Sequence, residues 1–352
     1  MNTDINIETY GFTRDLLPEG TDGTVARITA VYKDRFEIVS AHGNGYARLK
    51  KGSYYAGDEP FPTTGDFVLL SWQNDGDSII YKTLHRRTFF SRLDPSSAGH
   101  AEQAVAANFD YVFIMQSLNH DLNLRRLDRY LTLAWQSGAQ PVVLLTKADL
   151  NENWEAEADK VRAAALGVDV YAVSSKTGLG LDSVKQYLLP GKTIVFLGSS
   201  GVGKSSLLNA LAGQEMMDTG AIREDDSRGR HTTTHRQLIR LSCGAMIIDT
   251  PGMRELGMWD VSSGLGEAFS DIEQYFPLCR FSDCQHKSEP GCAVNTAIEN
   301  GELSRERWNS YLKLKNEAKY TENKNNYLRE RQQLHKSWAS RKKGRVVSET
   351  IE

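Results

Sequence analysis

One glycine-rich segment has the residue types and spacing of a loop that binds phosphate. Residues 198–205 read GSSGVGKS, which matches the pattern G-x-x-x-x-G-K-[ST]. The apolar run TIVFLG precedes it, and the helix-forming run SSLLNALAG follows it. Glycines let such a loop turn tightly so that its N–H groups point at phosphate oxygens, and a helix N-terminus adds positive potential. We therefore expect this segment to hold the phosphates of a nucleotide.

Two side chains of this loop have expected roles in chemistry. Lys204 should reach the β- and γ-phosphates, where it would also assist catalysis, and Ser205 should bind Mg²⁺. The other expected ligands share the loop and the first helical turn, and they are Gly198, Ser199, Ser200, Gly201, Val202, Gly203 and Ser206.

The segment DTPG at 249–252 ends the apolar run AMII, where a protein with a phosphate loop places a second Mg²⁺ ligand. Asp249 would hold Mg²⁺, usually through water, and the Gly252 N–H would approach the γ-phosphate. The polar stretch EDDSRGRHTTTHRQ lies between the two motifs. One of its threonines, Thr232–Thr234, is expected to supply a further hydroxyl to Mg²⁺, and we favour Thr233. The other interpretation is a β-prone threonine run that leads into the next strand.

The base-reading signal is TKAD at 146–149, directly after the apolar run PVVLL. GTPases carry [NT]-K-x-D here. The Asp149 carboxylate can accept hydrogen bonds from guanine N1–H and the 2-amino group, which adenine cannot offer. The stem of Lys147 can lie over the base, and Ala148 completes the box. Thr146 stands where Asn is more usual, so its hydrogen bond to neighbouring loops could be weaker. Ser174, Ser175 and Lys176 begin SSKTG, which fits the loop whose backbone contacts guanine O6.

The order of these motifs is unusual. In an ordinary GTPase the phosphate loop comes first and the base-reading boxes come last, whereas here TKAD and SSKTG precede the phosphate loop. If TKAD were accidental, the true base-reading box should follow DTPG. The only similar sequence there is NKNN at 323–326, which has neither the Asp nor a preceding strand. The sequence therefore predicts a GTPase whose elements are circularly permuted.

Three cysteines and a histidine lie close together near the C-terminal end. Cys279, Cys284, His286 and Cys292 are the four ligand types of a closed structural Zn²⁺ site, with no open position for catalysis. The residues near and between them that favour tight turns are Pro277, Asp283, Pro290 and Gly291. The alternative is a group of unbound thiols with an incidental histidine. The fourth cysteine, Cys243, stands alone in an apolar stretch and is expected in the core.

The elements that position these motifs form three parts. Five short alternating runs between about 24 and 83 predict a small β-barrel, either an OB-fold or an SH3-like barrel. Six strands follow, four with continuous apolar runs, which predicts a mainly parallel α/β sheet covered by helices. The expected division is a flexible leader (1–20), an OB-fold-like barrel (21–92), a permuted GTPase domain (100–262) and a helical zinc-binding domain with a basic helix and tail (263–352).

Composition bounds the class of protein. The chain has 352 residues and a formal net charge of −3, but residues 301–345 hold thirteen Lys or Arg against five Glu, about +8. This asymmetry favours an anionic partner, although a solvated helix face is the plainer explanation. No apolar run approaches the roughly 18 residues that span a bilayer, and the N-terminus lacks a secretory pattern. We expect a cytoplasmic monomer that does not bind membranes.

Taken together, the barrel, the boxes TKAD, SSKTG, GSSGVGKSS, HTTT and DTPG, and the pattern C-x4-C-x-H-x5-C resemble the ribosome small subunit-dependent GTPase A (RsgA, or YjeQ) family. The resemblance covers residues from about 20 to 340. It implies an OB-fold, a GTPase core, one structural zinc, and action with GTP and GDP in late maturation of the 30S ribosomal subunit, through its 16S rRNA. It also implies that the subunit stimulates hydrolysis.

The group that activates water remains open in the sequence. Met253 follows DTPG where Ras-like enzymes carry Gln, and methionine cannot orient water. The nearest candidates are His231 and His235, and the resemblance favours His231; otherwise both histidines contact RNA or solvent. A second class of function is a nucleotide-gated RNA-binding module in which hydrolysis is only a slow reset. A third, an ATP-dependent kinase or transporter ATPase, conflicts with TKAD.

Overall fold

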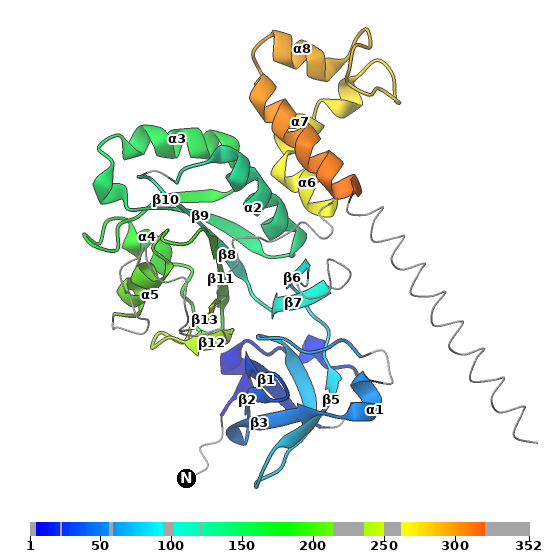
Figure 1. Ribbon diagram of the computed structural model, residues 1–352, viewed down its shortest axis with the longest axis vertical. Helices are drawn as coiled ribbons and strands as arrows, with labels where there is room; N and C mark the ends of the chain where they lie inside the picture. Colours follow the sequence, from blue (N-terminus) through cyan, green and yellow to red (C-terminus); the bar gives the residue numbers. More distant parts are fainter. Residues whose placement is uncertain are drawn as a thin grey trace, which may run out of the picture.

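The computed structural model describes residues 5–21, 23–55, 59–93, 102–119, 121–213, 236–249 and 262–320. Within them the chain forms a barrel, a sheet covered by helices and a small helical part, which lie one after another along the long axis of the molecule (Figure 1). The fold class expected from the sequence is confirmed.

The barrel consists of β1 (Thr24–Val31), β2 (Phe36–Ser40), β3 (Gly43–Leu49), β4 (Phe67–Ser71) and β5 (Ser78–Thr83). The strands close in the order β1-β2-β3-β5-β4-β1, with β3 and β5 parallel. Helix α1 (Lys51–Tyr54) follows β3. This five-stranded closed order is that of an OB-fold, so the first of the two barrel alternatives is correct. Alternate side chains such as Ile28, Ile38 and Val68 fill the interior.

The leader and the segment that follows the barrel differ from the sequence-based expectation. Residues 7–10 and 14–16 form short 3-10 helices, and Phe12 and Leu16 are buried against the barrel, so residues 5–17 are packed rather than loose. The segment at 86–108, which contains the boundary expected between the barrel (to 92) and the GTPase domain (from 100), forms an antiparallel hairpin of β6 (Phe89–Leu93) and β7 (Glu102–Ala107). The strand sequences FFSRL and EQAVAA do not alternate regularly between apolar and polar residues.

The central sheet has the order β10-β9-β8-β11-β13-β12. Its strands are β8 (Tyr111–Ser117), β9 (Gln140–Thr146), β10 (Asp169–Ala172), β11 (Thr193–Gly198), β12 (Gln237–Arg240) and β13 (Met246–Asp249). All neighbours are parallel except β12, which is antiparallel to β13. Strand β11, which precedes the phosphate loop, lies between β8 and β13 and is therefore central in the sheet. The chain order is permuted, but a common GTPase sheet results.

Helices cover both faces of this sheet. One hydrophobic cluster joins it to α2 (Leu124–Gln136) and α3 (Trp154–Ala164). Another joins its opposite face to α4 (Leu181–Lys185) and α5 (Lys204–Ala212). Burial on both faces accounts for the continuous apolar runs of β8, β9 and β11.

The barrel and the central sheet are joined through β1. Ala30 of β1 pairs with Gln237 of β12, which makes the two sheets continuous. Arg27, fully buried at this junction, donates to the carbonyl oxygens of Tyr10 (2.5 Å), Gly65 (3.2 Å) and Asn108 (2.8 Å). Burial lowers the pKa of Arg27 to about 9. One guanidinium thus connects three segments, which a surface arginine cannot do.

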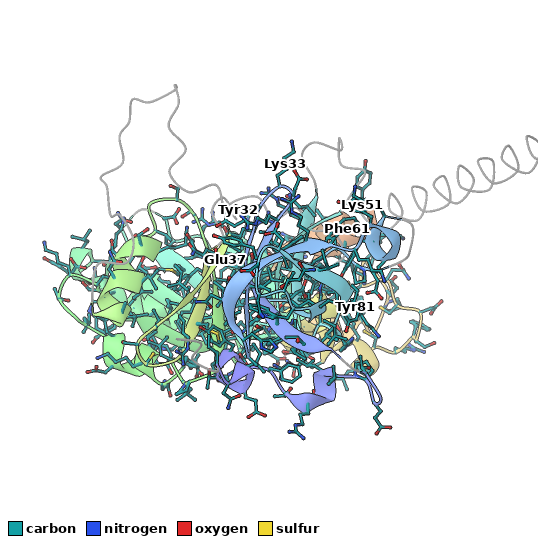
Figure 2. The ribbon with its side chains drawn as sticks, turned by 90° about the horizontal axis from the view of Figure 1, so that it is seen from below. Tyr32, Lys33, Glu37, Lys51, Phe61 and Tyr81 are labelled. Atoms are coloured by element: carbon teal, nitrogen blue, oxygen red, sulfur yellow. The ribbon has the colours of Figure 1, made fainter. Side chains whose placement is uncertain are left out.

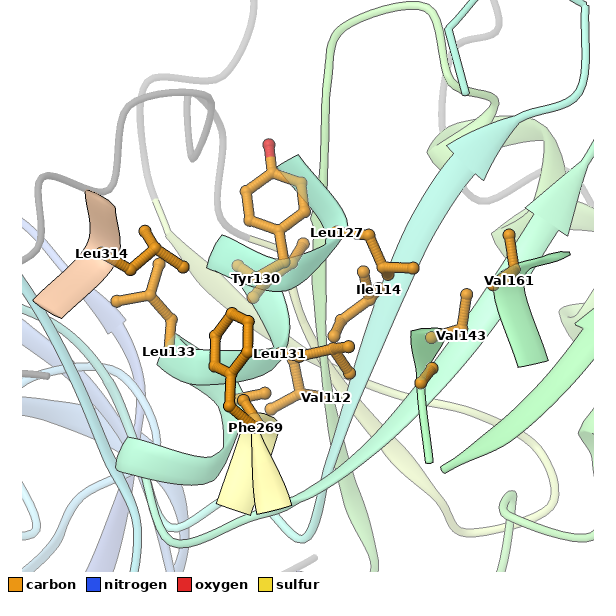
Figure 3. Packing of buried hydrophobic residues seen from close by; sticks show 14 of the residues in the cluster. Val112, Ile114, Leu127, Tyr130, Leu131, Leu133, Val143, Val161, Phe269 and Leu314 are labelled. Atoms are coloured by element: carbon orange, nitrogen blue, oxygen red, sulfur yellow. The ribbon is translucent and has the colours of Figure 1, made fainter. Parts of the chain in front are cut away.

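The C-terminal part contains α6 (Ser262–Ala268), α7 (Ser270–Glu273), a 3-10 helix (Phe276–Leu278), α8 (Ala293–Glu299) and a helix over 305–320. It packs on the outer face of α2. Figure 3 shows Phe269 and Leu314 against the α2 residues Leu131 and Leu133. The core of this part is therefore continuous with that of the central domain.

Candidate nucleotide site and metal cluster

The phosphate loop leaves the end of β11 and enters α5, as expected. At Gly198 a Cβ atom would lie 2.8 Å from the Met115 carbonyl oxygen, so a side chain there would collide with β8. Gly201 and Gly203 have φ of 72° and 99°, the left-handed region that favours glycine. Lys204 begins α5, and its Nζ donates to the carbonyl oxygens of Gly198 (3.1 Å) and Ser199 (2.9 Å). The ammonium is therefore held over the loop.

Two of the three expected Mg²⁺ ligands, Asp249 and Ser205, lie at this end of the sheet. Asp249 ends β13, which pairs with β11, and Ser205 lies in the first turn of α5. Burial raises the pKa of Asp249, and the charge of Lys204 opposes that rise. A divalent cation would favour the carboxylate in the same way, because it adds positive charge beside a desolvated anion.

The base-reading box begins where β9 ends. Thr146 is buried, and its Oγ1 donates to the Val202 carbonyl oxygen of the phosphate loop at 2.6 Å. The hydrogen bond that we expected to be weaker with Thr is therefore present. Lys147 has a φ of 58°, and Asp149 lies in a 3-10 helix at Ala148–Leu150. The Ala148 N–H donates to the Val173 carbonyl oxygen at 3.2 Å, which ties this box to the next one.

The second base loop is a tight turn after β10. Its buried Ser174 donates through N–H to the Leu179 carbonyl oxygen at 2.9 Å. The Ser174 hydroxyl accepts from the Thr177 N–H at 3.2 Å, and the Ser174 carbonyl accepts from the Gly178 N–H at 2.9 Å. These bonds fix the backbone at Ser175 and Lys176, where an oxygen of the base would be contacted.

The turn between β8 and α2, which carries no sequence motif, contacts both halves of the site. Leu118 donates through N–H to the Thr146 carbonyl oxygen at 2.9 Å. Asp121 accepts from the Ser199 hydroxyl at 2.5 Å. A turn of polar residues carries no periodic signal, and these partners are distant in the sequence. Its position directly after an apolar strand, at the edge where the other loops emerge, was the available clue.

Several expected site residues lie outside the described residues. They are His231, Thr232, Thr233, Thr234, His235, Gly252 and Met253. Their roles remain predictions.

The four expected metal ligands come together. One ligand atom from each of Cys279, Cys284, His286 and Cys292 lies within 4.8 Å of the others. His286 Nδ1 is 3.5 Å from both Cys279 Sγ and Cys292 Sγ. A tetrahedral ion with bonds of about 2.3 Å to sulfur and about 2.0 Å to nitrogen requires edges of this length. The cluster can therefore hold a metal ion. Cys243, which we expected in the core, is exposed in the turn between β12 and β13.

Neighbouring groups position the cluster. The His286 ring stacks on Phe276 with centroids 4.5 Å apart and meets Trp308 edge to face. The Glu289 carboxylate accepts from the N–H groups of Gln285, Lys287 and Ser288, which shapes the loop between the ligands. Burial raises the pKa of Cys284 to about 11 and lowers that of His286. Desolvated ligands of this kind are the ones that a bound cation stabilises.

The fold and the site define a circularly permuted P-loop GTPase that carries an N-terminal barrel and a C-terminal Cys/His cluster. Residues 83–259 match the family model described as RsgA GTPase. The chain is 46% identical over 330 residues, 93% of each chain, to the small ribosomal subunit biogenesis GTPase RsgA 1 of Listeria monocytogenes. It is 45% identical over 264 residues, 75% of this chain and 71% of the relative, to the corresponding protein of Methanosarcina acetivorans. The chain belongs to the RsgA GTPase family.

Two solved structures are also similar. One is YjeQ from Thermotoga maritima, with a TM-score of 0.64 and 25% identity over 84% of this chain and 98% of the other. The second is YloQ, described as a circularly permuted GTPase, with a TM-score of 0.59 and 27% identity over 86% and 97% of the two chains. Among the described residues, no helix is long and apolar enough to cross a membrane.

Proposed function

We propose that this GTPase acts in late maturation of the small (30S) ribosomal subunit, binding and leaving the subunit according to its GTP state. The observation that carries the proposal is the coverage of the relatives. The Listeria protein named for small ribosomal subunit biogenesis matches over 93% of both chains. The match thus includes the barrel and the Cys/His part as well as the nucleotide core. A match to the GTPase core alone would not indicate which partner the GTPase acts on.

The proposed ligands of GTP rest on the sequence motifs, supported by the arrangement of the loops that the structure describes. The phosphates would meet the N–H groups of 198–206 and Lys204, with Gly252 at the γ-phosphate. The base would meet Thr146–Asp149 and Ser174–Lys176. Mg²⁺ would be bound by Ser205 and Asp249, with Thr233 as its switch ligand. His231 is the proposed group that orients water, since methionine follows DTPG. We propose Zn²⁺ for the Cys/His cluster, because three thiolates and an imidazole favour it.

The proposed partner surface is basic and partly aromatic. Lys33, Lys51 and Phe61 are exposed on the barrel (Figure 2), and Tyr55 is exposed beside Phe61. Together with the basic segment after 301, they fit phosphates and unpaired bases of 16S rRNA. The proposal places the protein in the cytoplasm as a monomer with three units, at 21–92, 100–262 and 263–352.

The test compares GTP hydrolysis with and without purified small subunits, at fixed Mg²⁺. Stimulation by the small subunit but not by the large subunit supports the proposal. An unchanged rate with nucleotide-dependent binding favours the RNA-binding module whose hydrolysis is a slow reset. Competition between GTP and ATP in the same assay checks the base preference.

A further inference from the structure

The Asp121 carboxylate contacts the phosphate loop from outside the motif. Ser199 Oγ donates to Asp121 Oδ2 at 2.5 Å. Arg126, in the first turn of α2, lies with Nη2 2.8 Å from Asp121 Oδ1 and also donates to the Asp121 carbonyl oxygen. The carboxylate is about one-third exposed. The Asp121 carboxylate therefore binds the phosphate loop through Oδ2 and helix α2 through Oδ1.

The turn that carries Asp121 is itself fixed at both ends. Asn151 Nδ2 donates to the Leu118 carbonyl oxygen at 3.0 Å, close to the base-reading box. Asn123 donates through N–H to Gln116 Oε1 at 2.8 Å, and its own Oδ1 caps α2 by accepting from the Arg126 N–H at 3.1 Å. Asp121 thus lies between residues that are hydrogen-bonded to β8, to α2 and to the segment after the base-reading box.

We infer that Asp121 is a positioning residue for GTP binding and hydrolysis. It acts through Ser199, whose hydroxyl it holds so that the N–H groups of the loop stay aligned with the phosphates. A hydrogen bond to a carboxylate is stronger than a neutral one, and alignment before binding avoids an ordering cost when the nucleotide arrives. The inference rests on the proposed assignment of residues 198–205 to the phosphates of GTP.

A double-mutant cycle tests it on the full-length protein. Asp121→Ala and Ser199→Ala should each weaken the affinity for GTP and GDP about tenfold, which corresponds to 1.4 kcal/mol. The double variant should lose no more than the worse single variant, because both changes remove one bond. Asp121→Asn should recover most of the affinity, since its amide oxygen still accepts from Ser199. Asp182→Asn is the matched control, because it neutralises an exposed carboxylate that pairs with Lys185 on α4.

The outcomes separate this inference from the proposed site. Additive losses in the cycle, wild-type affinity in Asp121→Ala, or no recovery in Asp121→Asn would overturn the role of Asp121. Lys204→Ala is measured beside them and should abolish GTP binding. If Lys204→Ala instead binds GTP as the wild type does, the phosphate-loop assignment itself is wrong.

Discussion

Arg307 Nη1 lies 2.5 Å from Asp128 Oδ1, although 179 positions separate the two residues in the sequence. The same guanidinium contacts both Asp271 oxygens at 3.0 Å and lies over the Phe269 ring at 4.2 Å from its centroid. Asp128 also accepts from the Ser310 hydroxyl at 2.7 Å. The C-terminal part is therefore docked on α2 by an ion pair whose two side chains are almost fully buried.

Arg307→Ala should loosen this docking strongly. Removing one partner of a buried pair leaves the other charge without compensation, which costs about 3–5 kcal/mol. The measurement is the free energy of unfolding in urea. Arg129→Ala is the control, because Arg129 pairs with Glu317 across the same interface with both side chains about one-third exposed. That change should cost less than about 1 kcal/mol. Equal losses in the two variants would mean that the Arg307 pair is effectively solvated.

The same interface predicts a pH dependence. Burial raises the pKa of Asp128, and Arg307 opposes the rise only in part. The native state therefore binds more protons than the unfolded state between the ordinary carboxyl pKa and the raised one. Stability from this group is present at the acidic side of that window and is lost as pH rises through it. Asp128→Asn removes the titration, so wild-type stability minus variant stability should fall with rising pH. A difference that rises with pH would contradict the stated direction.

The strand ends could be predicted from sequence because the rules that set them are local. Gly198 and Thr146 follow continuous apolar runs, and such runs end where the chain leaves a buried sheet. Asp121 and Arg27 could not be assigned in this way. Their partners, such as Ser199 and Met246, are brought near by the sheet order, which no spacing encodes. The β6–β7 hairpin could not be predicted either, since the strands of a small two-stranded sheet need not alternate between apolar and polar residues.

Asp149→Asn should weaken GTP binding sharply and favour xanthine nucleotides. The carboxylate would accept two hydrogen bonds from guanine, whereas an amide presents a donor to one of those positions. The effect should appear in nucleotide competition, with a loss of at least about tenfold for GTP, or 1.4 kcal/mol. Asp159→Asn, on the exposed side of α3, controls for the loss of a surface charge. Wild-type GTP affinity in the Asp149 variant would mean that the base-reading box is misplaced.

Metal content tests the Cys/His cluster. Freshly purified protein should carry about one zinc per chain, as one tetrahedral site requires. Cys284→Ser should lose that zinc and loosen the C-terminal part, while GTP binding stays largely intact because the nucleotide loops lie elsewhere. Cys243→Ser is the matched control, since Cys243 is exposed and lies outside the cluster. Elemental analysis that finds no zinc in the native protein, or equal zinc in both variants, would refute the assignment.

Helix α6 is the element through which a bound nucleotide would affect the C-terminal part. Asp249 ends β13, and α6 begins at Ser262, so twelve residues of sequence separate the expected Mg²⁺ ligand from the C-terminal part. Helix α6 lies against α2, where the Gly264 N–H donates to Gln136 Oε1 at 3.0 Å. A Cβ at Gly264 would stand 2.2 Å from the Thr132 carbonyl oxygen, so Gly264→Ala must separate the helices.

We hypothesise that GTP sets the orientation of the C-terminal part through α6, and that hydrolysis releases it. A nonhydrolysable GTP analogue should then raise the affinity for the small subunit relative to GDP. Gly264→Ala should remove most of that difference. Gly266→Ala is the control, because its Cβ would meet only the end of the flexible Glu273 side chain at 3.2 Å. Deleting the whole part would be a poorer test, since it would expose the apolar face of α2 around Leu131. If Gly264→Ala keeps the full nucleotide-dependent change in affinity while GTP binding is normal, the C-terminal part does not report the nucleotide state.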